Sequence, residues 1–238
     1  MTVKICVCNQ KGGSRKTGLT TLITKALRGT KNLAIDCDPQ GGLSCNLAPS
    51  LKGIVHDVLM GKPCLPYLSV GDDNTYVFTS SYELDKLYVT LDHLAFKRAL
   101  KSIESEYDYI IFDTPPTMQG ITRAAAWYSD IILVPCEVSQ SSFGPTMYTL
   151  QCLEEIEKMG HVVIVGNRHE GYLAQLRDEM IKAFGEYYAG MIPSDVTSQK
   201  IIAGDIEVTV LKREKYLKPL CELIEILEVA HVSPQPSR

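Results

Sequence analysis

Five short runs of consecutive apolar residues, rich in β-branched side chains, recur along the chain and limit its fold more than any other feature. They are VKICVC (3–8), NLAIDC (32–37), YIIFDT (109–114), DIILVP (130–135) and HVVIVG (161–166). A strand with one face in water alternates apolar and polar residues, whereas these runs are continuous, as in strands covered on both faces. The runs therefore predict a buried parallel sheet, with a further short strand near 76–79.

Helical patterns separate these runs, at about 17–28, 92–106, 119–128, 142–159 and 172–184. The repeated order of strand, helix and strand is typical of an α/β fold, here a doubly wound, mostly parallel sheet flanked by helices. Segment 214–230 places apolar residues at helical spacing and is acidic in its distal half, which favours a last core helix over a membrane anchor. We expect one domain over 1–232 and a disordered tail over 233–238.

The composition narrows the class of protein. The chain has 238 residues and a net charge of −4, so contact with nucleic acid would need a local basic patch. None of the eight cysteines forms a CxxC pair, and most lie in apolar runs, which favours buried, reduced thiols and a cytoplasmic location. No apolar run approaches the roughly 20 residues that cross a bilayer, and we expect no secretion signal and no membrane partner.

The stretch VCNQKGGSRKTGLTTL (7–22) follows the first apolar run and opens the first helical pattern. A loop in this place aims several backbone N–H groups and the positive end of a helix dipole at one point, where a phosphate chain fits. Gly12 and Gly13 allow the tight backbone path, Lys16 would reach the β and γ phosphates, and the Thr17 hydroxyl would bind Mg²⁺.

Gln10 and Arg15 stand where the strict pattern GxxxxGK[ST] has its fixed glycines. A non-glycine residue in a left-handed backbone conformation costs on the order of 1–3 kcal/mol, about the energy of one charge-assisted hydrogen bond. We therefore expect nucleotide binding to survive, with hydrolysis slow or dependent on a partner. The guanidinium could contact a phosphate along the groove or point outward to a partner subunit. The alternative is a non-hydrolysing interaction module on the same scaffold.

Acidic residues follow two other apolar runs. AIDCDPQGG places Asp36 and Asp38 at the carboxyl end of a strand, where open α/β sheets bind ligands, and YDYIIFDTPPT ends its run in Asp113. Carboxylates beside phosphates suit Mg²⁺ coordination and the orientation of an attacking water molecule. For the first pair, aspartates that cap the following turn are the ordinary alternative.

With these motifs in this order, the sequence resembles the ParA-type partition ATPases. They belong to the P-loop proteins with a deviant Walker A motif, a group that also includes MinD and the nitrogenase iron protein. The resemblance covers residues 3 to about 200, and the matching segments are NQKGGSRKT (9–17), DCDPQGG (36–42), YDYIIFDTPPT (107–117), SDIILVPCEVS (129–139), VGNRHE (165–170) and MIPSDVTSQK (191–200).

The resemblance implies roles for individual residues. Lys11 matches the signature lysine, which in this family reaches the partner's phosphates across a nucleotide-sandwich dimer. Ser14 and Gly18 differ from the residues usual in the family, at positions expected to be permissive. The implied sets are Lys11, Lys16 and Asp38 for catalysis; Lys11, Gly12, Gly13, Ser14, Arg15, Lys16, Thr17, Gly18, Asn167 and Pro193 for the nucleotide; and Thr17, Asp36 and Asp113 for the metal.

The resemblance also implies a function: an ATPase that uses ATP and Mg²⁺, dimerises with ATP, binds DNA non-specifically and segregates or positions plasmid, viral or chromosomal DNA. A centromere-binding ParB-like adaptor is the implied partner. The alternatives are a MinD-like ATPase that binds a membrane and a nitrogenase-type reductase, for which only Cys136 lies near the right region. The basic residues that could contact DNA are Lys200, Lys212, Arg213, Lys215 and Lys218.

Overall fold

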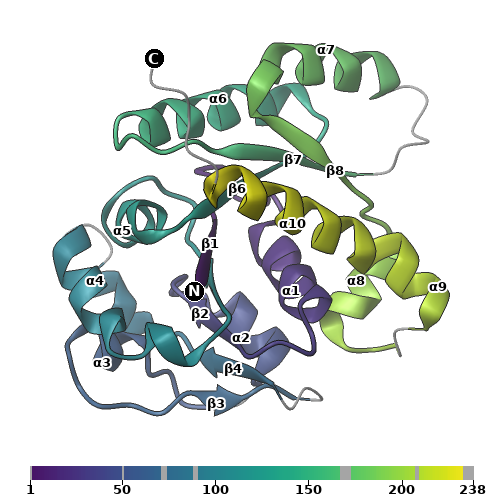
Figure 1. The fold of residues 1–238 in the computed structure, drawn as a ribbon. Helices are drawn as coiled ribbons and strands as arrows, with labels where there is room; N and C mark the ends of the chain where they lie inside the picture. Colours follow the sequence, from purple (N-terminus) through teal and green to yellow (C-terminus); the bar gives the residue numbers. More distant parts are fainter. Residues whose placement is uncertain are drawn as a thin grey trace.

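The computed structural model describes residues 2–49, 51–70, 74–87, 91–166, 173–206 and 209–232. Eight strands in these ranges form one sheet in the order β3-β4-β2-β5-β1-β6-β7-β8 (Figure 1). Every neighbouring pair is parallel except β3 with β4. The strands are β1 (Val3–Val7), β2 (Asn32–Asp36), β3 (Tyr67–Leu68), β4 (Thr75–Phe78), β5 (Tyr109–Asp113), β6 (Ile131–Cys136), β7 (His161–Val165) and β8 (Tyr188–Ile192).

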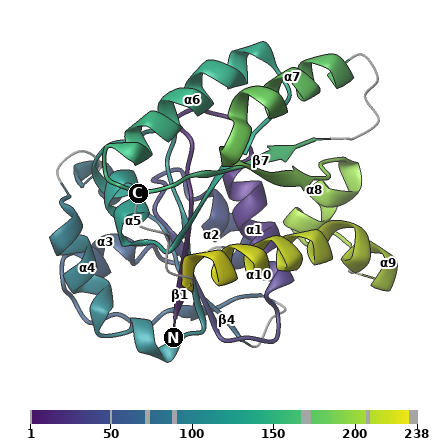
Figure 2. The same ribbon diagram turned by 45° about the horizontal axis from the view of Figure 1, so that its top comes forward.

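Helices cover both faces of the sheet, as Figures 1 and 2 show from two directions. One face carries α1 (Lys16–Ala26), α2 (Gly42–Leu47), α8 (Val196–Ala203) and α10 (Lys218–Val232). The other carries α3 (Val55–Leu59), α4 (His93–Lys101), α5 (Gly120–Tyr128), α6 (Gln140–Glu154) and α7 (Ala174–Phe184). A short helix, α9 (Val210–Lys212), and a π-helical turn, Arg213–Leu217, lead into α10.

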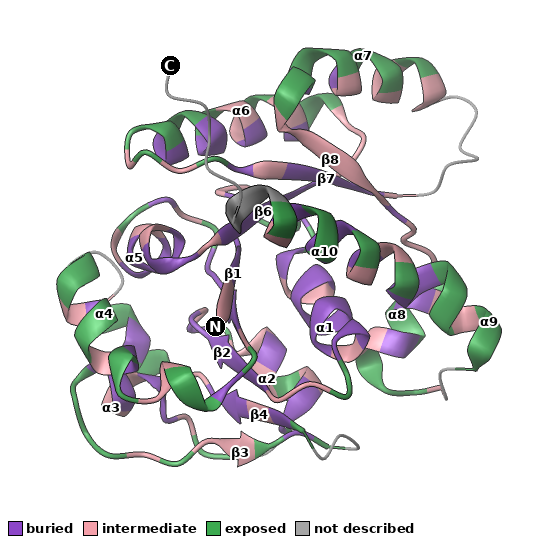
Figure 3. Ribbon diagram, in the orientation of Figure 1, coloured by how far each residue is buried: buried purple, intermediate pink, exposed green. Residues whose placement is uncertain are grey.

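Strand β1 shows why the predicted strands are continuously apolar. Ile5 and Val7 pack in the core beneath α1 and α10, whereas Cys6 packs in the opposite core, beneath α5 and α6. All three side chains are fully buried, and Figure 3 shows the burial on both sides of the sheet. All eight cysteines are free, and five of them are buried, as the sequence predicted. None of the helices in the described ranges is long and apolar enough to cross a membrane.

The doubly wound architecture is confirmed, and the five predicted long strands are correct to within one residue at each end. The helix predicted at 142–159 is too long, because α6 ends at Glu154 and the chain turns at Glu157, where φ is 57°. The helix predicted at 92–106 is also too long: α4 ends at Lys101, and only a short 3₁₀ turn follows. The predicted tail, 233–238, lies outside the described residues, and the single domain over 1–232 stays a prediction.

Candidate nucleotide-binding site

The loop that joins β1 to α1 lies where β1 meets both β5 and β6, the place where the strand order reverses. Asn9, which is fully buried, fixes this loop. Its Nδ2 donates to the Pro135 carbonyl (2.9 Å) and to Thr146 Oγ1 (3.0 Å), while its Oδ1 accepts from the Lys11 backbone N–H (2.9 Å). Sequence reasoning missed this role, because the partners of Nδ2 lie 126 and 137 residues away along the chain.

The two glycines of the loop leave its backbone open to solvent. Gly12 and Gly13 are exposed, and no other atom lies within 4 Å of the position that a Cβ would take on either. Gly13 has a φ of 75°, a conformation that favours glycine. The Ser14 hydroxyl is buried and has no hydrogen-bond partner among the described residues. A buried polar atom of this kind calls for a ligand or water to satisfy it.

Lys16 begins α1 and is only 7% exposed. Its Nζ donates to the Lys11 carbonyl at 3.2 Å. Burial lowers the pKa of Lys16, and the negative charges of Asp113 and Asp38 oppose that shift. The ammonium is therefore held at the loop with capacity for further hydrogen bonds, because it has three donors.

Two carboxylates meet at the ends of adjacent strands, since Asp36 of β2 and Asp113 of β5 are register partners. Asp113 accepts from Thr17 Oγ1 (2.7 Å) and Thr20 Oγ1 (3.1 Å), and Asp36 accepts from the Ser44 N–H (2.7 Å) and Oγ (2.6 Å). Burial, the first cause, raises the pKa of Asp113 to about 8 and that of Asp36 to about 6. Two adjacent buried acids with raised pKa values favour binding of a cation.

Asp38 and Lys11 lie nearer the surface. Asp38 is half-buried, and its Oδ1 accepts from the Gln40 N–H at 2.9 Å. Lys11 Nζ donates to Ser141 Oγ (3.0 Å) and Ser142 Oγ (2.7 Å), both at the start of α6 of its own chain. The predicted contact of Lys11 with a partner subunit would require this side chain to leave both hydroxyls.

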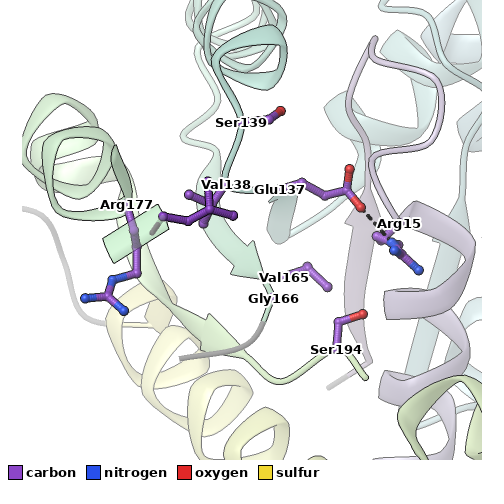
Figure 4. A pocket seen from close by; sticks show the side chains of 9 residues that line it. Arg15, Glu137, Val138, Ser139, Val165, Gly166, Arg177 and Ser194 are labelled. Atoms are coloured by element: carbon purple, nitrogen blue, oxygen red, sulfur yellow. Dashed lines mark hydrogen bonds and ion pairs between the residues drawn. The ribbon is translucent and has the colours of Figure 1, made fainter. Parts of the chain in front are cut away.

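Arg15 adopts the left-handed conformation expected for its position, with φ 70° and ψ 22°, and precedes the first residue of α1. Its Nε lies 2.7 Å from Glu137 Oε1, just after β6, so the side chain pairs with a carboxylate of its own chain (Figure 4). Pro193 and Arg15 line the same cavity, and the place of Pro193 beside the base stays a prediction. Asn167 lies outside the described residues.

The basic residues predicted for DNA are only partly available. Lys200 is exposed on α8. Lys215 Nζ lies 3.1 Å from Asp195 Oδ2, and Lys218 Nζ lies 2.9 Å from Glu214 Oε2. Each of these two charges has an acidic neighbour, which weakens the field that a patch presents to phosphate. DNA contact through this segment stays a prediction.

These residues fit a nucleotide with Mg²⁺. The unsatisfied Ser14 hydroxyl, the buried Lys16 ammonium and the open glycine backbone form an anion cradle. Thr17 and the two buried acids supply oxygen atoms, the ligands that Mg²⁺ prefers. Within the described ranges, no three His, Cys, Asp or Glu side chains are grouped to hold a metal ion.

A phosphate loop after the first strand, with acidic strand ends beside it at the reversal of strand order, defines a P-loop nucleotidase. The sequence profile of the family described as "AAA domain" matches residues 2–162, more than half of the chain. The chain therefore belongs to this family, and its relatives place it among the ParA/MinD-type P-loop ATPases, a class that uses ATP with Mg²⁺. The predicted resemblance is confirmed.

Two relatives illustrate the range of likeness. The "Maintenance of carboxysome distribution protein A" of Gloeothece citriformis (strain PCC 7424) is 26% identical over 247 residues, 95% of this chain and 90% of that one. The "Chromosome partitioning protein ParA" of Myxococcus xanthus (strain DK1622) is 30% identical over 149 residues, 56% of this chain and 51% of that protein.

Solved structures share the fold. Apo McdA of Cyanothece superposes with a TM-score of 0.81 at 19% identity, over 94% of this chain and 100% of that one. The septum site-determining protein MinD of Pyrococcus horikoshii OT3, complexed with Mg-ADP, gives a TM-score of 0.74 at 22% identity, over 98% and 100%. At these identities, the likeness supports the architecture alone.

Proposed function

We propose that this chain is a positioning ATPase that dimerises with ATP, binds DNA without sequence preference and segregates plasmid, viral or chromosomal DNA through a ParB-like adaptor. One observation carries the proposal: Lys16 and Thr17 of the loop face Asp113, which is in register with Asp36, at the point where the strand order reverses. This arrangement places a cation, a hydroxyl and two carboxylates around the place for a phosphate chain. The choice of DNA as the positioned object rests on the names of relatives, two of which are named for chromosome partitioning.

Individual residues take distinct roles in this proposal. Lys16 would stabilise negative charge on the phosphates, and Thr17, Asp36 and Asp113 are the residues that would hold Mg²⁺. When bound, Mg²⁺ neutralises charge that develops on the phosphates. Asp38 is the least buried of the three acids and is oriented by a backbone N–H, so it suits the orientation of an attacking water molecule.

Lys11 makes hydrolysis conditional on dimerisation. In the single chain, its ammonium rests on two serine hydroxyls rather than on a carboxylate. Neutral hydroxyl acceptors are weaker partners for an ammonium than phosphate oxygens, because a charged acceptor about doubles the strength of the bond. Lys11 can therefore exchange Ser141 and Ser142 for a partner's phosphate when two chains meet. We propose slow turnover by the free protein and stimulation by the adaptor.

The test measures assembly and DNA binding together. The variant Asp38→Ala, which slows hydrolysis in this scheme, should be a dimer by light scattering with Mg-ATP and a monomer with Mg-ADP. The dimer alone should shift a random-sequence DNA fragment in a gel, with affinity that falls steeply as salt rises. The matched control, Lys16→Ala, should remain a monomer. A protein that stays monomeric in saturating Mg-ATP, or binds DNA equally without nucleotide, contradicts the proposal.

A second cargo is favoured by one comparison. The relative aligned with 95% of this chain is named for carboxysome distribution, so a protein assembly could replace DNA as the positioned object. In that case the ATPase would be unchanged and the adaptor would select the cargo. Cross-linking the ATP-bound dimer to its adaptor, followed by mass spectrometry, distinguishes a DNA-binding adaptor from one that binds a protein shell. Sedimentation with liposomes and ATP tests the MinD-like alternative.

A further inference from the structure

Two cavities meet at the Arg15 side chain. One, of about 180 Å³, extends from Arg15 and Glu137 to α7 and is lined by Val165 and Gly166 at the end of β7 (Figure 4). The other, of about 230 Å³, lies between α1 and the loop after β8. Arg15, Val165 and Ser194 line both cavities. Arg15 is therefore one of three residues at the boundary between the two cavities.

Each cavity alone is smaller than the roughly 300–1,000 Å³ of a typical small-molecule site. Arg15 has the longest side chain of the three residues at their boundary, so its movement would widen the connection between the cavities. Little opposes that movement, because the Arg15 side chain is 43% exposed and that of Glu137 is 31% exposed. Ion pairs between exposed groups are weak, and dissolved salt screens them further.

The two cavities and the buried acids Asp36 and Asp113 lie on opposite sides of the phosphate loop. Lys16 and Thr17 interact with Asp113 on β5, on the β2 side of β1. The Arg15 guanidinium instead reaches the segment after β6, on the other side of β1. If the terminal phosphate lies with the acids, the nucleoside end of the ligand lies toward Arg15 and Glu137.

We propose that Arg15 and Glu137 form a nucleotide-exchanged latch over the nucleoside end of the site. When a nucleotide enters, the guanidinium leaves Glu137 and binds the phosphate nearest the ribose, and the two cavities become one groove. A guanidinium matches phosphate well, since its planar fork can donate two parallel hydrogen bonds. The inference rests on the proposed nucleotide site and adds to it a residue pair that sets affinity.

The latch predicts that Glu137 competes with the ligand. Glu137→Gln removes the competing charge while Arg15 stays, so both ATP and ADP should bind about two- to fivefold more tightly, as loss of a weak exposed pair allows. Arg15→Gly removes the phosphate contact and leaves Glu137 as an unpaired anion, so both nucleotides should bind at least tenfold more weakly. Because the contact lies on the part that ATP and ADP share, the ratio of their affinities should stay within twofold.

The experiment is isothermal titration of the full chain with Mg-ATP and Mg-ADP at two salt concentrations. Arg15→Lys, which keeps the charge and the need for left-handed backbone, should fall between the wild type and Arg15→Gly. The double variant Arg15→Gly with Glu137→Gln should recover part of the loss. The matched control is Glu155→Gln, which breaks the exposed Arg123–Glu155 pair (3.1 Å) at the far end of α6 and should change neither affinity.

Two failures are distinguishable. If the wild type binds both nucleotides but Glu137→Gln and the Arg15 variants alter affinity by less than twofold, the latch is refuted and the proposed function stands. A wild type that binds neither nucleotide at millimolar concentration refutes the proposed function itself. Should Arg15→Gly fail to fold, Glu137→Gln and Arg15→Lys still decide the matter. A change in the ATP to ADP affinity ratio above fivefold would place Arg15 at the terminal phosphate and also refute the latch.

Discussion

Replacing Asn9 by alanine should both destabilise the fold and release the phosphate loop. The Asn9 side chain takes part in four hydrogen bonds, three of them buried, including one at 3.3 Å from Thr149 Oγ1 to its Oδ1. Each contributes about 1 kcal/mol net, and a buried group left without a partner costs about 1–3 kcal/mol. Because Asn9 is fully buried, water does not readily replace these partners. We expect the free energy of unfolding to fall by about 3–4 kcal/mol.

Urea unfolding measures this change, followed both by far-UV circular dichroism and by the fluorescence of Trp127, the single tryptophan. Coincidence of the two transitions is required before a free energy is extracted. The companion variant Thr149→Val removes a hydroxyl that donates to Asn9 Oδ1 and to the Pro145 carbonyl and accepts from the Gln10 N–H. It should cost about 1–2 kcal/mol. Because the two residues are in contact, the double variant should lose less than the sum, by about 0.5–3 kcal/mol.

Asn46→Ala is the matched control. Among the residues that the structure describes, the Asn46 side chain, on helix α2, makes one hydrogen bond, from Nδ2 to Thr21 Oγ1 (3.0 Å). Asn46→Ala should cost about 1 kcal/mol and leave nucleotide affinity unchanged, whereas Asn9→Ala should weaken affinity because the Lys11 N–H loses its partner. An Asn9→Ala variant within 1 kcal/mol of the control would refute the argument that this side chain fixes the loop.

Three further predictions follow from individual contacts. Lys16→Ala removes the buried ammonium, so Mg-ATP should no longer raise the thermal unfolding midpoint. Burial raises the pKa of Asp113 to about 8, so the folded state binds more protons than the unfolded state. The free energy of unfolding therefore falls as pH rises from about 4 to 8. In a chelating buffer, Asp113→Asn should be more stable than the wild type at pH 7.5 and equal to it near pH 4. A Cβ on Gly18 would lie 3.2 Å from Ile202 Cδ1, so Gly18→Val should lower the free energy of unfolding by about 1–3 kcal/mol, measured by urea unfolding.

The sequence predicted the strands well where burial on both faces left a continuous apolar signal. Strand β8 was missed because its signal is weak. Four of its five residues are only half-buried, Gly190 interrupts it, and its register with β7 shifts between Val162 and Val163. Helix α8 was missed although Asp195 and Ser198 form a capping box at its start, because the helix is only eight residues long and its apolar signal is short. Helix α2 is shorter still, and it was missed as well.

The convergence of Lys16, Thr17, Asp36 and Asp113 was predictable from sequence, because parallel strands bring their carboxyl ends to one edge of the sheet. The contacts that fix the phosphate loop were not predictable from sequence. Asn9 meets Thr146 across 137 residues, and nothing local to either residue indicates the pair. The direction of Arg15 was likewise undetermined, since its partner Glu137 is 122 residues away. Long-range side-chain pairs of this kind are set by packing of the whole domain.

Arg15 is the residue at which local preference and observed structure disagree most. A left-handed conformation costs an L-residue about 1–2 kcal/mol, and glycine there would avoid that strain at a cost of about 0.4–1 kcal/mol in unfolded-state entropy. The exposed pair with Glu137 returns only about 0–1 kcal/mol. The contacts of the free chain thus give little stability in favour of arginine over glycine at this position. Strain of this kind collects at ligand sites, and Arg15 lies at the boundary between two cavities of such a site. The energetic reason for an arginine here must then be sought in the bound state, which is what a latch requires.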